Sequence, residues 1–265
     1  MEKNINRIPL AIVVAGIIIT LAILSKNENK IVVKGEIEQV SDGVVLPIVW
    51  GDLGAKLVSV GAIDDSKLKV INDEKLKITQ ENASQILNLF WALGLASKNP
   101  ILESGEMADK KYGGPQNFAS TAGWTIAKGN PMDHYNHHKF FNLTPEQQAL
   151  VDKVSRGIYR PCCGNSTHFP DCNHGMAMLG LLELMASQGV SEKDMWKSAL
   201  IVNSYWFPDN YDTIATYMKN RGIEWKNVNP QEILGINYSS AQGYAKISTQ
   251  VVKPQQPKSS GSCSV

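Results

Sequence analysis

The chain has 265 residues, which is enough for one large domain or two small ones. Its formal net charge is +1 and no run of basic residues occurs, so we expect no nucleic-acid partner. Hydrophobic residues make up 43% of the chain, as in proteins with a packed core. Four cysteines are too few for a disulfide-rich scaffold, so their positions carry more information than their number.

The first distinctive segment is the uncharged, apolar run at residues 8–24. Lys3 and Arg7 precede it, and the polar residues after it show no small-residue cleavage pattern. The run is about as long as the shortest helices that span a bilayer, so we expect a retained transmembrane anchor within residues 1–30. This anchor makes the lipid bilayer a partner and predicts a single-pass membrane protein whose main domain is extracytoplasmic.

Apolar periodicity and helix-start signals predict a mainly α, helical bundle-like domain over residues 31–245. Thr144, Pro145 and Gln147 form a strong start signal, with a capping threonine, a first-turn proline and a glutamine that can complete a capping box. The expected elements are an extended stem at 31–40, short helices at 52–60 and 64–70, and longer helices at 80–96, 144–158, 176–188, 191–205 and 209–220.

The expected helix at 176–188 is apolar almost all round, which places it at the centre of the bundle. The segment 103–131 is rich in Gly, Ser, Thr and Asn, and we expect a packed loop anchored by Phe118 and Trp124. Residues 246–265 are mostly Pro, Gln, Lys and Ser, a composition typical of a flexible tail.

The densest group of reactive side chains lies within residues 160–176. Thiolates and imidazoles are the side chains that bind zinc and copper(I), and four of them complete a tetrahedral site. The glycines and the proline of this segment keep it looped, so its side chains can converge. The sequence therefore predicts a copper or zinc site with candidate ligands Cys162, Cys163, His168, Cys172 and His174.

Two alternatives for this cluster stay open. The cysteines could form a structural disulfide while the histidines only pack, or they could act in thiol–disulfide exchange. Additional ligands are also conceivable, because three histidines would share one face if residues 134–138 were helical, although a solvated loop is the alternative there. A thioether next to the cluster suits copper(I) but also suits core packing, and a tail thiol could reach the site. These additional candidates are His134, His137, His138, Met176 and Cys263.

The segment 161–164 (Pro-Cys-Cys-Gly), followed by His168 and then Asp-Cys at 171–172, resembles the motif order of the PCYCGC-motif proteins of bacterial cell envelopes. The similarity extends through the next helix to Gly-Val-Ser at 189–191 and covers about residues 160–205. This chain has fewer cysteines than that family and no lipoprotein cysteine. The resemblance implies an envelope location and metal binding without a defined activity. We therefore expect a metal-binding protein rather than an enzyme, with a redox protein or a disulfide-stapled envelope interaction domain as alternatives.

Overall fold

The computed structural model describes residues 43–67 and 75–251, and this part of the chain is mainly helical, as the sequence predicts. Strands β1 (Val44–Val45) and β2 (Lys77–Ile78) pair antiparallel, with Val44 opposite Ile78. The expected anchor at 8–24, the stem at 31–40 and Cys263 lie outside the described residues. Within the described ranges, no helix has both the length and the apolar character needed to cross a membrane.

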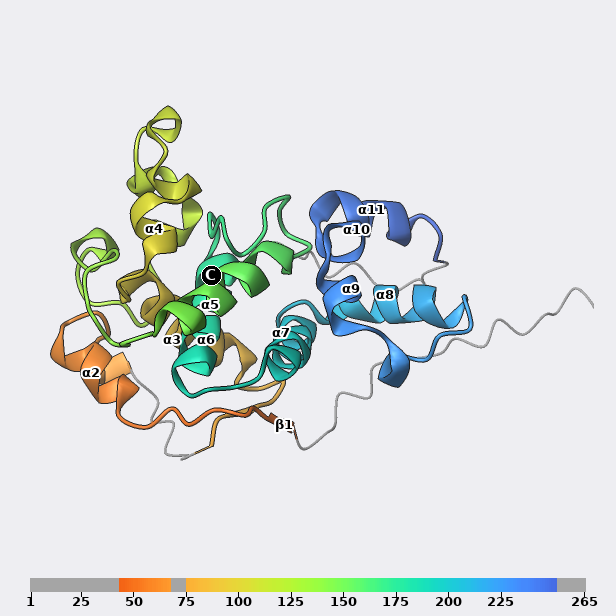
Figure 1. Cartoon of the computed structure of the whole chain (residues 1–265), viewed down its shortest axis with the longest axis horizontal. Coiled ribbons are helices and arrows are strands. Elements are labelled where there is room, and N and C mark those ends of the chain that lie inside the picture. Colours follow the sequence, from red (N-terminus) through yellow and green to blue (C-terminus); the bar gives the residue numbers. More distant parts are fainter. Residues whose placement is uncertain (1–42, 68–74, 252–265) are drawn as a thin grey trace, which may run out of the picture. The chain divides into compact units, whose positions relative to one another are not determined.

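Helices α3 (Ala83–Ala96) and α6 (Asn173–Ser187) form the centre of the fold (Figure 1). Their backbones touch where Gly94 faces Gly180, because a Cβ on Gly180 would lie only 2.6 Å from the carbonyl oxygen of Phe90. Residues of α6 from Gly175 to Ala186 are all buried, which confirms its predicted central position. The close α3–α6 packing fixes where α6 begins, and that point carries the candidate site.

Helices α5 (Pro145–Gly157) and α7 (Glu192–Trp206) pack on α6. The predicted start of α5 is confirmed, since the backbone N–H of Gln147 donates to Thr144 Oγ1 and the Thr144 N–H donates back to Gln147 Oε1. Helix α7 begins after Ser191, whose hydroxyl caps it by accepting from the Asp194 N–H. Both bounds agree with the predicted helices to within a few residues.

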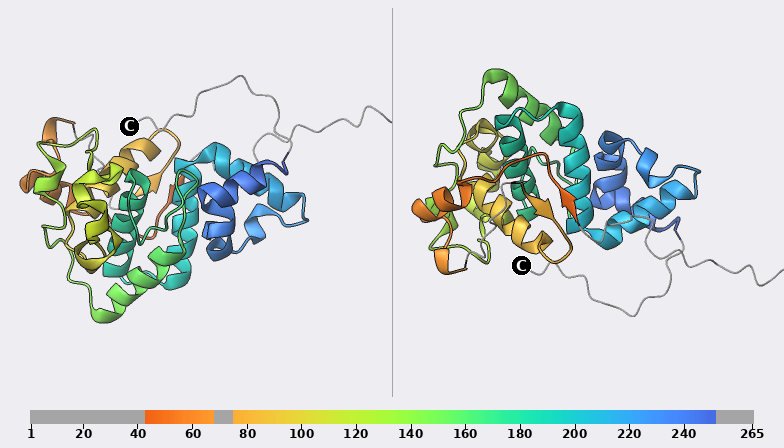
Figure 2. Two further views of the ribbon diagram at one scale, coloured as in Figure 1. Left: turned by 90° about the horizontal axis from the view of Figure 1, so that it is seen from above. Right: turned by 90° about the horizontal axis from the view of Figure 1, so that it is seen from below.

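The C-terminal helices gather at one end of the described domain, where both views of Figure 2 show them together. Helix α8 (Pro208–Lys219) matches the predicted helix at 209–220. The sequence did not predict α9 (Pro230–Leu234), α10 (Ile236–Ser239) or α11 (Ala241–Ser248), because helices of one or two turns show little periodicity. Helix α11 also continues beyond the predicted start of the tail at 246, and residues 252–265 lie outside the described part.

The segments before α5 contain helix α2 (Leu53–Ser59), a 3-10 turn at Asp65–Lys67 and the short α4 (Pro100–Ser104). The predicted packed loop at 103–131 is confirmed, with several 3-10 turns inside it. Phe118 packs edge-on against Phe169 at 5.3 Å between ring centroids, and Trp124 packs against Trp91 at 6.0 Å. These contacts hold the loop against the helical core next to the cysteine segment.

One expected boundary needs correction, and the structure also decides the conformation of the histidine segment. Helix α6 begins at Asn173, before the expected start at Met176, so Cys172 stands at its N-cap and His174 lies within its first turn. Residues 134–138 are not helical: Asn136 has φ 51°, a left-handed conformation that ends any helix there. The local turns are set instead by hydrogen bonds from this segment to the end of α3.

Candidate metal centre

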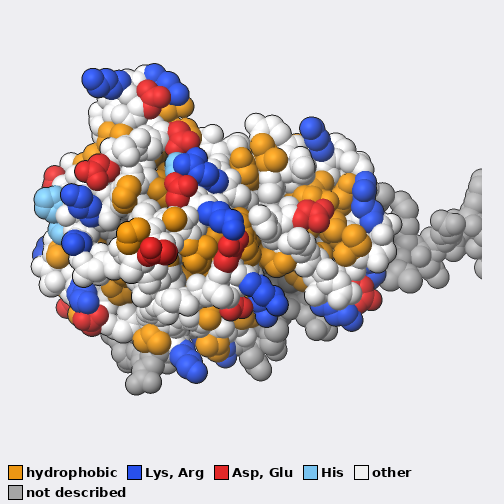
Figure 3. Space-filling view, in the orientation of Figure 1, with side chains coloured by type: hydrophobic (Ala, Val, Ile, Leu, Met, Phe, Trp, Pro, Cys, Tyr) orange, Lys and Arg blue, Asp and Glu red, His pale blue; other side chains and the backbone are white. Residues whose placement is uncertain are grey.

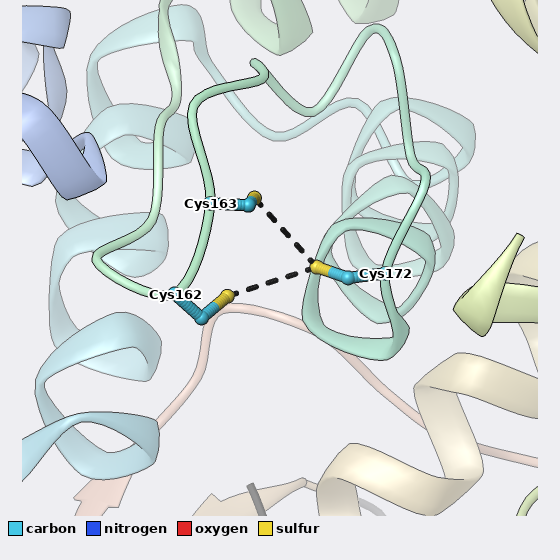
Figure 4. Close-up of side chains that lie close together, drawn as sticks. All are labelled: Cys162, Cys163 and Cys172. Atoms are coloured by element: carbon cyan, nitrogen blue, oxygen red, sulfur yellow. Dashed lines mark hydrogen bonds between the residues drawn. The ribbon is translucent and has the colours of Figure 1, made fainter.

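Three thiols converge between the loop after α5 and the start of α6 (Figure 4). Cys162 Sγ lies 3.8 Å from Cys172 Sγ, and Cys163 Sγ lies 3.9 Å from it. All three sulfur atoms are within 4.8 Å of one another, and all three cysteines are free, half-buried thiols. This is the only group of three or more Cys, His, Asp or Glu ligand atoms that meets that spacing within residues 43–67 and 75–251.

The cysteine loop is held on both sides by backbone hydrogen bonds. The Thr167 N–H donates to the carbonyl of Ile158 at 2.8 Å, which folds the segment back onto the end of α5. The carbonyl of Cys163 accepts from the Ala241 N–H at 2.9 Å, which ties the thiol pair to the start of α11. Because these bonds fix the backbone, the positions of the sulfur atoms do not depend on a metal ion alone.

Arg160 lies next to the thiols and is almost fully buried, with only 1% of its side chain exposed. Its Nε–H donates to Cys172 Sγ at 3.0 Å, and its Nη2 donates to Asp171 Oδ1 at 2.7 Å. The same guanidinium donates to the carbonyls of Asn165 at 3.1 Å and Phe169 at 3.2 Å. Arg160 therefore ties both arms of the loop to the thiol at the start of α6.

Gly175 leaves the space that this guanidinium occupies. A Cβ at Gly175 would lie 2.5 Å from Cζ and Nη2 of Arg160, closer than real Cβ atoms approach their neighbours. The roles of Arg160 and Gly175 were not predicted from the sequence. The available signals were an arginine directly before the Pro-Cys-Cys motif and a glycine, a weak helix former, in the first turn of an apolar helix.

The three cysteine side chains differ in pKa. The pKa of Cys172 is held well below its ordinary value, first by hydrogen bonding from Cys162 and Cys163 and then by the positive charge of Arg160. The pKa of Cys162 is raised by the contacts with the other two thiols and by burial. The contact with Cys162 lowers the pKa of Cys163, but Cys172 and burial outweigh it and bring the pKa to about 11. Of the three side chains, Cys172 is therefore the one whose thiolate form the site favours most.

His174 lies beside the thiols on the first turn of α6. Its ring packs against Phe207 at 4.3 Å and Trp206 at 5.9 Å between centroids. Its Nδ1 is buried and has no hydrogen-bond partner among the described residues. Hydrogen bonding by this imidazole is also one of the influences that lower the pKa of Cys172. The predicted ligand His174 therefore contacts Cys172, although neither of its ring nitrogens lies within 4.8 Å of all three sulfur atoms.

The structure places His168 in a different network from the thiols. Its Nδ1 lies 2.9 Å from Glu106 Oε2 and its Nε2 lies 2.9 Å from Asp152 Oδ1, so both ring nitrogens are engaged by carboxylates. The cause is local, since the His168 N–H donates to the carbonyl of Ser155 and brings the side chain against α5. The side chain of Met176 is fully buried in the apolar core, in agreement with the packing alternative.

The remaining predicted candidates gather in a separate histidine loop, which we define as residues 134–138. His134 Nδ1 and His138 Nε2 are hydrogen-bonded to each other at 3.0 Å, and the His137 ring meets the His138 ring edge-on at 4.9 Å between centroids. Burial lowers the pKa of His134, and the nearby His137 lowers it further. The negative charge of Asp133 partly offsets this effect. Burial and the other two histidines lower the pKa of His138. The three histidines thus come together without the helix that the sequence argument assumed.

Comparison of this chain with family models, with curated proteins and with solved structures found no match. The class of protein is therefore defined by its own features: a mainly α domain with three thiols grouped so that they could hold a metal ion.

Proposed function

We propose that this chain is a metal-binding protein that holds Zn²⁺ or Cu⁺ with Cys162, Cys163 and Cys172. The main support is the spacing of the sulfur atoms. Cys172 Sγ lies 3.8 Å from Cys162 Sγ and 3.9 Å from Cys163 Sγ. Tetrahedral coordination with metal–sulfur bonds of about 2.3 Å places sulfur ligands about 3.8 Å apart. Cys172 Sγ thus already stands at this separation from each of the other two sulfur atoms, and all three lie within 4.8 Å of one another.

His174 is the proposed fourth donor. Its buried Nδ1 lacks a hydrogen-bond partner among the described residues, and a buried polar atom without a partner is costly unless a ligand satisfies it. Its ring is held by Phe207 and Trp206, so little side-chain freedom is lost on binding. Three thiolates and one imidazole form a common ligand set of structural zinc.

The charge of the site favours a divalent ion. Three thiolates and a divalent ion leave one net negative charge, and the buried guanidinium of Arg160 lies against Cys172 to neutralise it. Asp171 shares this guanidinium, so a monovalent ion would leave more negative charge uncompensated. On this ground we place Zn²⁺ ahead of Cu⁺.

A second candidate function is thiol–disulfide exchange. Cys172 is favoured as a thiolate at the N-terminus of a long helix, and Cys162 lies within reach as a resolving thiol at 3.8 Å. The two functions predict different chemistry. Exchange forms a disulfide and releases two electrons to an external disulfide, whereas metal binding keeps all thiols reduced.

We also propose that residues 8–24 anchor the protein in a bilayer with the metal-binding domain on the extracytoplasmic side, as the PCYCGC-motif resemblance implies. The support is the uncharged run itself and the absence of a cleavage pattern after it. Extraction of membranes with alkaline carbonate tests this proposal. The protein should remain with the membranes, and release into the supernatant would contradict an integral anchor.

The test of metal binding is metal content and free-thiol count on protein purified without chelator. The wild type should carry one thiol-bound ion, which C162S, C163S, C172S and H174A should each lose or bind much more weakly. His168→Gln is the matched control, because both nitrogens of His168 are already engaged, and it should keep this ion. A metal-free wild type with an oxidised pair among Cys162, Cys163 and Cys172 would favour thiol–disulfide exchange instead.

A further inference from the structure

A second group of metal-binding side chains lies apart from the thiol cluster, on the histidine loop. Figure 3 shows histidine side chains exposed together at the left edge of the molecule. His134 Nδ1 and His138 Nε2 lie 3.0 Å apart, and their rings are inclined by only 32°. Two nitrogens bound to one ion at about 2.0–2.1 Å are separated by roughly 2.9–3.4 Å for octahedral to tetrahedral angles. The two nitrogens form a hydrogen bond whose 3.0 Å length is also the spacing of adjacent ligands, so a bound ion would take the place of the shared proton, which is released to solvent.

The backbone of the loop is fixed by the end of α3. The N–H of Asn136 donates to the carbonyl of Leu95 and that of His138 donates to the carbonyl of Ala96, each at 2.8 Å. Asn136 is the one non-glycine residue with positive φ in the described ranges, and its Oδ1 accepts from the Asn99 N–H at 2.7 Å. A residue with positive φ held by two hydrogen bonds, next to a third from His138, shows that the surrounding structure specifies this loop closely.

A backbone contact also orients the imidazole of His134. The backbone of Gly61 hydrogen-bonds the His134 side chain, while Nδ1 of that ring faces His138. A backbone partner orients the imidazole ring, as it does in metal-binding histidines, and Nδ1 of His134 is held by the hydrogen bond to His138 that an ion would replace. His137 is exposed and its ring contacts His138 edge-on, so it lies beside the pair without completing it.

We propose that His134 Nδ1 and His138 Nε2 form a second metal site, for a borderline divalent cation such as Zn²⁺. Imidazole nitrogens suit this class of ion, and solvent supplies the remaining ligands because the loop is at the surface. With only two protein ligands, the site binds more weakly and exchanges more readily than the thiol cluster. It is independent of the proposed function, since it uses none of the residues of the cluster.

Titration of the reduced full chain with Zn²⁺ by calorimetry tests this proposal. The wild type should bind two equivalents, one tight and one weaker. His134→Gln together with His138→Gln should remove the weaker equivalent and keep the tight one. His137→Ala is the matched control from the same loop and should still bind two.

Two equivalents in the H134Q/H138Q variant, or loss of the weaker equivalent in H137A, would overturn the assignment to this pair. Loss of the tight equivalent in C162S/C163S/C172S tests the thiol cluster separately, so the two proposals can fail independently. If H134Q/H138Q does not fold, the imidazole C–H resonances of the wild type provide a second readout. Zn²⁺ in excess of one equivalent should shift the resonances of His134 and His138, and unchanged resonances would contradict the proposal.

Discussion

Replacement of Gly175 by alanine should damage the thiol cluster without touching a thiol. The new Cβ would lie 2.5 Å from Cζ and Nη2 of Arg160 and 2.9 Å from Nε, so the guanidinium must move. Its Nε–H bond to Cys172 Sγ and its ion pair with Asp171 then lengthen or break. The substitution therefore tests whether Arg160 holds the site together.

The magnitude follows from three effects. Overpacking a close contact costs about 1–3 kcal/mol, and loss of a hydrogen bond to a charged group costs about 1.5–3 kcal/mol. Alanine in a helix offsets this by about 1 kcal/mol relative to glycine. Together these effects predict that Gly175→Ala lowers the free energy of unfolding by about 1.5–5 kcal/mol and weakens Zn²⁺ binding.

Urea unfolding of the metal-free protein measures the loss of stability as a lower midpoint at unchanged slope. Arg160→Met provides the matched background, because methionine keeps part of the aliphatic stem but has no guanidinium to collide with. In that background, Gly175→Ala should cost nothing or stabilise slightly. Wild-type stability in the single variant, or an equal loss in both backgrounds, would refute the proposed role of the Gly175–Arg160 contact.

Two further predictions concern ionisation. Burial raises the pKa of Glu183 to about 8 from 4.5, although Asn99 donates a hydrogen bond to its Oε1. Its contribution to stability is therefore complete below about pH 4.5 and falls by about 1.4 kcal/mol per pH unit up to about pH 8. Unfolding at several pH values should show this slope in the wild type, and an equal slope in Glu183→Gln would contradict the assignment. Iodoacetamide at pH 7 should label Cys172 before Cys162 in the reduced, metal-free protein, and peptide mass spectrometry showing the reverse order would contradict the thiolate assignment.

The long helices could be predicted from the sequence because their signals are local. The Thr144 cap with its Gln147 partner and the apolar run of α6 depend only on neighbouring residues, and both are confirmed. The short helices α9 to α11 are too brief to show periodicity. The contact between Gly94 and Gly180 joins segments far apart in the chain, and no local pattern reveals such a pair.

The candidate site was likewise predictable from the sequence only in part. The density of cysteines indicated the thiol cluster, and the three thiols do converge. Sequence spacing could not show that His168 faces Glu106 and Asp152, because hydrogen bonds to α5 decide its direction. Nor could it show that Arg160 is buried, since arginine is usually exposed and its burial depends on the space left by Gly175.

X-ray absorption at the zinc edge tests directly whether Cys162, Cys163 and Cys172 bind the metal ion. The measurement is best made on the zinc-loaded H134Q/H138Q variant, in which the thiol cluster is the remaining proposed site. We predict a first shell of three sulfur atoms at about 2.3 Å and one nitrogen at about 2.0–2.1 Å. A shell of nitrogen and oxygen without sulfur would contradict metal binding by Cys162, Cys163 and Cys172.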